Sequence, residues 1–161
     1  MWWRRTASEF ARAKGAANRA ALRRVVEAGP PPGLLAFRGR EPIGWIALAP
    51  REAYPRLDRS RVLKPVDDRP VWSVTCFFVA GQHRGQGITV RMLRAAVDFA
   101  GKHGAKFVEG YPVDTRGGRS PDVWVYTGLH PAFRKAGFRE VARRSRSRPI
   151  MRRGCAGRGK A

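Results

Sequence analysis

A buried strand, a glycine-rich turn and an amphipathic helix follow one another between Val71 and Lys102. Residues 71–79 are apolar at most positions, which is typical of a central strand covered on both faces. Residues 88–102 have apolar side chains at helical spacing opposite a charged face. The apolar stripe of this helix consists of Leu93, Ala96, Val97 and Ala100. A second apolar strand follows at residues 105–108, so the sequence predicts a crossover between two parallel neighbouring strands.

The segment before this unit is expected to form helices and then a hairpin. Thr6 to Glu9 has the spacing of a capping box, and Ala-rich helical periodicity continues to Ala28 with a break at Gly15. A glycine and three prolines then end the helix, because proline has no amide hydrogen to donate. Apolar runs at residues 34–37 and 43–48, separated by a turn, predict the hairpin.

The remaining sequence predicts one long loop, a few short elements and a basic tail. Residues 50–70 show no sustained period, and loops of this length inside a compact domain are often functional. The last elements expected are a short helix at residues 131–137 and strands at residues 138–142 and 148–151. From residue 152 onward Gly, Arg and Lys predominate. We therefore expect one domain over residues 1–151 and a disordered tail at residues 152–161.

The glycine-rich turn at residues 82–87 has the composition of an anion-binding site. The first amides of a helix lack intrahelical partners, and the helix dipole adds partial positive charge there, so a pyrophosphate satisfies both. Gly85 and Gly87 let the backbone approach the phosphates closely, and Arg84 adds a full positive charge.

Three phosphate-binding motifs compete for this turn. The Walker A loop needs a Lys where Ile88 stands, and the dinucleotide fingerprint needs a third glycine where Val90 stands. The pattern Gln/Arg-x-x-Gly-x-Gly/Ala is complete, with Gln82, Gly85 and Gly87. A tight turn without a ligand is the alternative, and the strand and helix that flank the turn argue against it.

Residues 77–88 resemble the acyl-coenzyme A signature of the GCN5-related N-acetyltransferases, the GNAT superfamily. Residues 132–138 are similar to the last helix of that family and the Gly-Phe that follows it, and the hairpin around residues 42–45 is similar to its second and third strands. The resemblance covers roughly residues 15–145. It implies an α+β fold of three layers (α/β/α), whose mixed and mostly antiparallel central sheet has a parallel pair splayed at the acyl-coenzyme A site.

The resemblance implies transfer of an acetyl group from acetyl-coenzyme A to an amine of a small molecule or a peptide. The family binds the pantetheine arm at the end of the central strand and the pyrophosphate in the turn, and the thioester lies beside the next strand. The corresponding cofactor-binding residues here are Phe77, Phe78, Val79, Gln82, His83, Arg84, Gly85, Gln86, Gly87 and Ile88. The side chain of His83 itself is expected to be exposed.

The catalytic groups follow the family less closely. The family's last helix often carries a Tyr that protonates the leaving thiolate, and Phe133 occupies that position here. Glu109 is the best-placed candidate for the base and Asp114 a second one. An ion pair with one of the many arginines is the favoured alternative for Glu109. Tyr126 or Tyr111 could replace the missing acid, although a packing role is more common for a Tyr, and we take Glu109 and Tyr126 as catalytic candidates.

Several features bear on the acceptor and on the N-terminus. The loop at residues 50–70 and the break at Gly15 are expected to form the walls of the acceptor site. Asp67 and Asp68 could attract a cationic amine, although loop acids are usually solvated. Met1 to Trp3 is all that corresponds to the family's first strand.

The charge of the chain is its most unusual bulk property. The 161 residues include 33 Lys and Arg against 12 Asp and Glu, for a net charge of +21. An Arg-rich composition with a solvated tail is favoured over nucleic-acid binding, because no interleaved aromatic and basic residues accompany the charge. Nucleic-acid binding therefore stays as an alternative. In either case the positive surface attracts a polyphosphate ligand such as coenzyme A.

The other expectations concern metals, location and partners. The two cysteines, Cys76 and Cys155, form neither a metal site nor a disulfide framework. No apolar run has the length of a membrane span and no secretory signal is visible, so we expect no membrane partner and a cytoplasmic location. A homodimer is left open. Because Phe133 replaces the acid, a non-catalytic module that binds acyl-coenzyme A is a further alternative.

Overall fold

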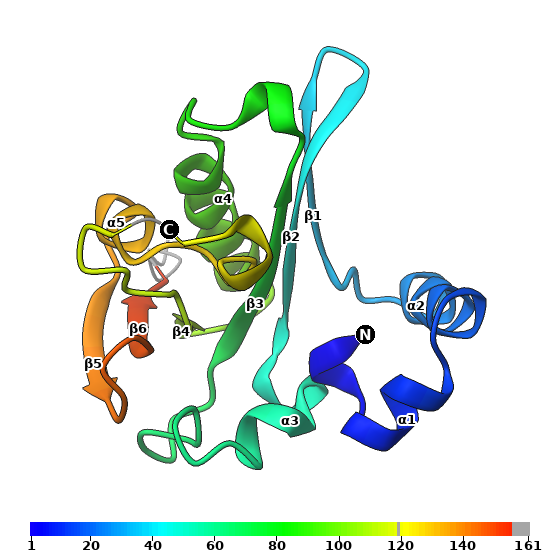
Figure 1. Ribbon diagram of the computed structural model, residues 1–161, viewed down its shortest axis with the longest axis horizontal. Helices are drawn as coiled ribbons and strands as arrows, with labels where there is room; N and C mark the ends of the chain where they lie inside the picture. Colours follow the sequence, from blue (N-terminus) through cyan, green and yellow to red (C-terminus); the bar gives the residue numbers. More distant parts are fainter. Residues whose placement is uncertain (119, 156–161) are drawn as a thin grey trace, which may run out of the picture.

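The protein is built around one six-stranded sheet with the strand order β1-β2-β3-β4-β6-β5. The computed structural model describes residues 1–118 and 120–155. The strands are β1 (Gly33–Arg38), β2 (Glu41–Pro50), β3 (Trp72–Val79), β4 (Phe107–Gly110), β5 (Arg139–Arg143) and β6 (Pro149–Gly154). All neighbours are antiparallel except β3 and β4, which are parallel. The α+β fold class with one parallel pair is thereby confirmed (Figure 1).

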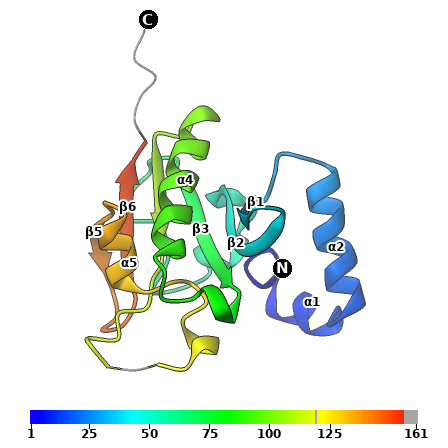
Figure 2. The same ribbon diagram turned by 90° about the horizontal axis from the view of Figure 1, so that it is seen from above.

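Helices lie on both sides of strands β1 to β3. The α-helices are α1 (Ala7–Arg12), α2 (Ala16–Glu27), α3 (Pro55–Asp58), α4 (Ile88–Lys102) and α5 (His130–Lys135). Short 3₁₀ helices are η1 (Trp2–Arg4), η2 (Arg51–Ala53), η3 (Gly81–His83) and η4 (Asp122–Trp124). Both views show α4 on one side of these strands and the α1–α2 pair on the other (Figures 1 and 2). The three-layer arrangement expected from the sequence is therefore present.

The N-terminal helices form where the sequence predicts them. The Thr6 hydroxyl accepts the Glu9 amide at 3.3 Å and the Glu9 carboxylate accepts the Thr6 amide at 2.8 Å, which completes the capping box. The buried Asn18 side chain joins the two helices by donating to the Phe10 carbonyl at 3.0 Å. Residues 2–4, which correspond to the family's first strand, form a 3₁₀ helix instead.

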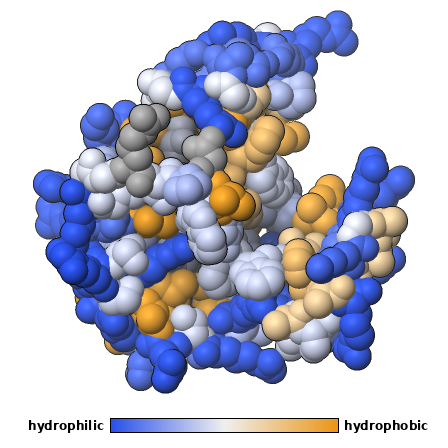
Figure 3. Space-filling view, viewed as in Figure 1, coloured by the Kyte–Doolittle hydropathy of each residue, from blue (hydrophilic) through white to orange (hydrophobic). Residues whose placement is uncertain are grey.

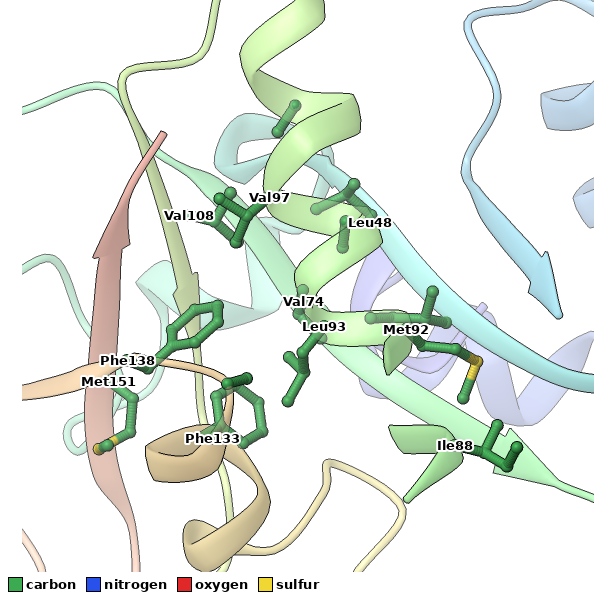
Figure 4. Close-up of a cluster of buried hydrophobic side chains, with 14 of the residues drawn as sticks. Leu48, Val74, Ile88, Met92, Leu93, Val97, Val108, Phe133, Phe138 and Met151 are labelled. Carbon is green, nitrogen blue, oxygen red and sulfur yellow. The ribbon is translucent and has the colours of Figure 1, made fainter. Parts of the chain in front are cut away.

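The main core lies between α4 and the sheet. The predicted stripe of α4 is buried, and Leu93 and Val97 pack in one cluster with Val74 of β3 and Val108 of β4 (Figure 4). Phe133 of α5 belongs to the same cluster and is 0% exposed. This core holds the start of α4 against the end of β3, which is where the glycine-rich turn lies.

Strand β6 continues three residues beyond the predicted domain end at residue 151. Arg152 lies within the sheet and is 8% exposed, because its guanidinium is paired on two sides. Its Nη1 and Nη2 donate to both oxygens of Asp67 at 2.8 and 2.9 Å, and its Nε donates to Oε1 of Glu109 at 2.8 Å. Residues 152–154 therefore belong to the sheet and not to the predicted tail, and residues 156–161 lie outside the described part of the chain.

Arginines also hold the segment at residues 50–70, in which the sequence showed no sustained period. The Arg51 guanidinium donates to Asp58 at 3.0 Å, to the Leu63 carbonyl at 2.8 Å and to the Tyr111 hydroxyl at 2.7 Å. Arg144 donates to the carbonyl oxygens of residues 64 and 65 at 2.6 and 2.9 Å. These hydrogen bonds hold the segment in place, and η2 and α3 are the helices that it contains.

We predict that Arg152→Met lowers the free energy of unfolding by about 3 to 5 kcal/mol, because the buried Glu109 loses its closest cation. Chemical denaturation measures the change. Arg139→Met is the matched control, since Arg139 is an exposed residue on the edge strand directly opposite Arg152 in register. Equal stability of the two variants would contradict the assignment of a stabilising role to this ion pair.

Candidate functional site

The parallel strands β3 and β4 separate soon after they meet. They pair only over residues 72–74 and 108–110, and β3 then continues to Val79 without β4 beside it. The chain returns to this edge much later, where the Phe77 amide donates to the Tyr126 carbonyl at 2.7 Å. A bridge between Val113 and Leu129 closes the returning segment onto the end of β4. The separation leaves room along the second half of β3.

A pocket of about 760 Å³ occupies this room. Its walls are the end of β3, the glycine-rich turn, the first turn of α4 and the segment from residue 123 to residue 135. The volume is within the range of about 300 to 1,000 Å³ that is usual for small-ligand pockets. The lining residues are Phe77, Phe78, Val79, His83, Arg84, Gly85, Gly87, Ile88, Thr89, Val90, Val123, Val125, Tyr126, Gly128, Leu129, Pro131, Ala132 and Lys135.

The glycine-rich turn presents bare backbone to the pocket. Gly85 and Gly87 have φ values of 74° and 73°, in the left-handed region that side chains other than glycine resist. No protein atom lies within 4 Å of where a Cβ on either residue would stand. Gly87 caps α4 without a side-chain hydrogen bond, and Ile88 and Thr89 of the first turn line the pocket. The first amides of a helix have no intrahelical acceptor, and an anionic group can satisfy them.

Gln86 supports the turn from outside the pocket. Its side-chain amide donates to the Gln82 carbonyl at 3.0 Å and accepts Arg38 of the hairpin at 2.7 Å. Its backbone carbonyl accepts Arg91 of α4 at 3.1 Å. All the expected cofactor-binding residues line the pocket except Gln82 and Gln86, whose hydrogen bonds hold the turn in shape.

Part of the backbone at the end of β3 is already engaged. The Phe77 amide is bonded to Tyr126, and the Val79 carbonyl accepts the Arg84 Nε at 3.0 Å. These two groups are therefore satisfied within the chain, which narrows the set of strand-end groups that could hold a pantetheine arm.

His83 is buried, whereas the sequence suggested an exposed side chain. It is 6% exposed, and neither ring nitrogen has a hydrogen-bond partner among the described residues. The closest acid is Glu41 at the start of β2, whose Oε1 lies 4.0 Å from Nε2. No sequence pattern indicated that Glu41 of β2 would lie beside this ring.

Glu109 does not line the pocket. It is 1% exposed, with Oε1 2.7 Å from the Arg152 Nη2 and Oε2 3.9 Å from Arg51. The Tyr111 hydroxyl donates to it at 3.3 Å, and burial first and this carboxylate second raise the pKa of Tyr111. The structure thus places Glu109 in the ion pair that was the alternative to a catalytic role. Asp114 is likewise paired, 2.9 Å from Arg143.

Tyr126 does line the pocket, and its ring is half-buried. Burial raises the pKa of its phenol, so the hydroxyl keeps its proton at neutral pH. The Phe133 ring occupies the space into which a Cβ on Gly110 or on Gly128 would project. Phe133 is not among the residues that line the pocket. Of the two predicted catalytic residues, the structure brings only Tyr126 to the candidate site.

Sequence reasoning missed the wall formed by the returning segment. Val123, Val125, Gly128 and Leu129 line the pocket, although they belong to no strand. Nothing in their spacing shows that residue 126 returns to β3, because that contact spans about fifty residues.

Metal and membrane features are absent from the described residues. Within residues 1–118 and 120–155, no group of three His, Cys, Asp or Glu side chains could hold a metal ion. Over the same part of the chain, no helix combines the length and hydropathy needed to cross a bilayer.

Splayed parallel strands with a glycine-rich turn between strand and helix are the arrangement that the resemblance to the GNAT superfamily implies. In sequence, the acetyltransferase (GNAT) family model matches residues 2–116. The chain therefore belongs to the acetyltransferase (GNAT) family, as the resemblance implied. Family membership supports acyl-coenzyme A-dependent acyl transfer in general. No curated protein matches the sequence significantly.

Solved structures are similar in fold. A GNAT-family acetyltransferase from Listeria monocytogenes has a TM-score of 0.56 at 10% identity, covering 92% of this chain and 77% of its own. A GNAT-family structure from Desulfovibrio desulfuricans has a TM-score of 0.55 at 15% identity, covering 91% and 88%. A chain of the NatC complex bound to Gag peptide and CoA has a TM-score of 0.54 at 12% identity, covering 85% and 79%. Identities this low indicate a shared fold alone.

We predict that Gly87→Glu removes coenzyme A binding measured by calorimetry. The introduced carboxylate would occupy the expected pyrophosphate site and repel the phosphates. Gly104→Glu is the matched control. Gly104 also has a positive φ and open space around it, but it lies beyond the other end of α4, about 25 Å away by helix rise. Both variants carry the same backbone strain and charge, so equal loss or equal retention of binding would rule out the turn as the phosphate site.

Proposed function

We propose that the protein is an N-acetyltransferase that moves an acetyl group from acetyl-coenzyme A to an amine of a small molecule or a peptide. The observation that carries the proposal is the uncapped start of α4, whose turn opens into the pocket beside the unpaired half of β3. Family membership supports it, as does the fold shared with the NatC chain, whose complex holds CoA and a peptide.

The residues present fit acetyl-coenzyme A, which would supply the acetyl group as a thioester. The amides around Gly85 and Gly87 would hold the pyrophosphate, with Arg84 and Lys135 adding positive charge at the pocket wall. The apolar walls from β3 and the returning segment would enclose the pantetheine arm.

The chemistry requires two proton movements. A carbon–nitrogen bond forms while the carbon–sulfur bond breaks, so the thiolate gains a proton and the amine loses one. Tyr126 is the proposed donor to the sulfur, because its phenol is protonated at neutral pH and lines the pocket. No carboxylate is among the described lining residues, so the proton of the amine is proposed to leave through water.

A module that binds acyl-coenzyme A without turnover is the second candidate. The burial of Phe133 beneath the pocket favours it, since the helix that carries the acid in the family contributes no hydroxyl here. Calorimetry with coenzyme A and an assay of thiol release from acetyl-coenzyme A together separate the two candidates. Coenzyme A binding without thiol release across a broad amine panel would select the module, and the absence of both would remove both candidates.

We predict that Tyr126→Phe lowers kcat for thiol release from acetyl-coenzyme A by about 10²-fold, as is usual for loss of a general acid. The calorimetric affinity for coenzyme A should stay unchanged, because the ring still lines the pocket. Trp124→Phe serves as the control, being a 66% exposed aromatic residue of the same segment that does not line the pocket. A kcat equal to that of the control would exclude Tyr126 as the acid.

A further inference from the structure

A row of apolar side chains lies on the side of the sheet that faces away from α4. Leu35, Trp45 and Phe78 stand opposite one another across β1, β2 and β3. Paired residues project to the same face of a sheet. Their neighbours Ile46 and Phe77 pack into the core with α4, so the row projects to the opposite side.

Much of this row is open to solvent. Leu35, Phe37 and Phe78 are 55%, 56% and 58% exposed. The indole of Trp45 occupies the space into which a Cβ on Gly33 would project. Because Gly33 has no side chain, the ring can lie against β1. Contiguous exposed apolar surface of this kind marks interaction sites in soluble proteins.

The apolar row forms one wall of a groove whose other wall is α2. Figure 3 shows a hollow between the β1–β2 hairpin and α2, with apolar side chains on both sides and an opening outward between them. On α2, Val26 is 54% exposed. We call this hollow, with Leu35, Phe37, Trp45 and Phe78 on its sheet side, the apolar groove.

The apolar groove meets the pocket at Phe78. This residue belongs to the row and also lines the pocket. Tyr126, the proposed acid, is hydrogen-bonded through its carbonyl to the neighbouring Phe77. A molecule lying along the groove would therefore bring one end to the place where Tyr126 acts.

The groove lies in a positively charged part of the chain. Between Ala16 and Glu41 there are five arginines and two glutamates, and one of these, Glu27, is 2.7 Å from Arg23. An anionic occupant is attracted by this field. A second copy of the chain, which also carries +21, would be repelled by it.

The apolar groove meets the pocket at Phe78 and lies in a positively charged part of the chain. From these observations we propose that the acyl acceptor is the free amine of an apolar, acidic peptide, whose apolar side chains lie on Leu35 and Trp45. Because the groove opens outward, a peptide bound in it can continue beyond the groove, whereas a closed cavity would exclude the rest of the peptide. This inference rests on the proposed function for the transfer itself, but the binding of the peptide can be measured without it.

Calorimetry with saturating coenzyme A compares three peptides with free N-termini: Phe-Leu-Glu-Glu, Phe-Leu-Lys-Lys and Gly-Ser-Glu-Glu. We expect the first to bind at least tenfold more tightly than either of the others, because each lacks one of the two features that the groove recognises. Equal affinity of the first two peptides would overturn the charge component, and equal affinity of the first and third would overturn the apolar component.

A matched pair of variants locates the binding. Leu35→Ser should weaken Phe-Leu-Glu-Glu binding about tenfold, whereas Val141→Ser should leave it unchanged. Val141 is also an exposed apolar residue, 39% exposed, on β5 at the opposite edge of the sheet. Both substitutions are at exposed positions, so neither should prevent folding. Equal affinity of the two variants would place the peptide elsewhere and overturn the proposal.

The acetylation of the bound peptide is then assayed separately. If the peptide binds in a way that depends on Leu35 but no thiol is released, the proposed transfer is contradicted. The apolar groove is then still supported as a peptide-binding site. Thiol release with amines that do not bind the groove would confirm transfer and overturn the inferred acceptor.

Discussion

The parting of β3 from β4 is the constraint on which the rest of the site depends. Parallel pairing stops at Val74 and Gly110, and from there the backbone groups of β3 need another partner or a ligand. The returning segment supplies one partner, the Tyr126 carbonyl, and thereby carries a phenol to the edge of the pocket. The same parting gives the pocket its volume and places the uncapped start of α4 at its mouth.

Buried arginines explain how a strongly basic chain holds its loops in place. Arg51 and Arg152 lie inside the protein, where Arg51 donates to a carboxylate and a carbonyl oxygen and Arg152 donates to two carboxylates. Glu109 and Asp67 are consumed in these contacts, which removes them from the chemistry of acyl transfer. Arg84 and Lys135 line the pocket, and five arginines lie between Ala16 and Glu41 near the apolar groove, so both places would attract anionic ligands.

The predictable parts of the fold were those encoded by local pattern. The bounds of α4, the capping box at Thr6 and both strands of the hairpin follow from spacing that neighbouring residues share. The turn at residues 82–87 was recognisable because glycine is needed wherever φ is positive. An ion pair of Glu109 with an arginine was the favoured alternative, but its partner Arg152 and the burial of His83 could not be predicted, because each contact joins residues more than forty positions apart.

The sequence by itself determined the glycine-rich turn, the helix that follows it and the family to which both belong. Only the tertiary structure decided which groups face the pocket. It brought Tyr126 to β3, turned Glu109 into an ion pair with Arg152 and left Leu35 and Phe78 uncovered on the far side of the sheet. The physical reason is that turns and helices are specified by contacts within a few residues, whereas catalytic and acceptor surfaces arise where strands distant in sequence separate or meet.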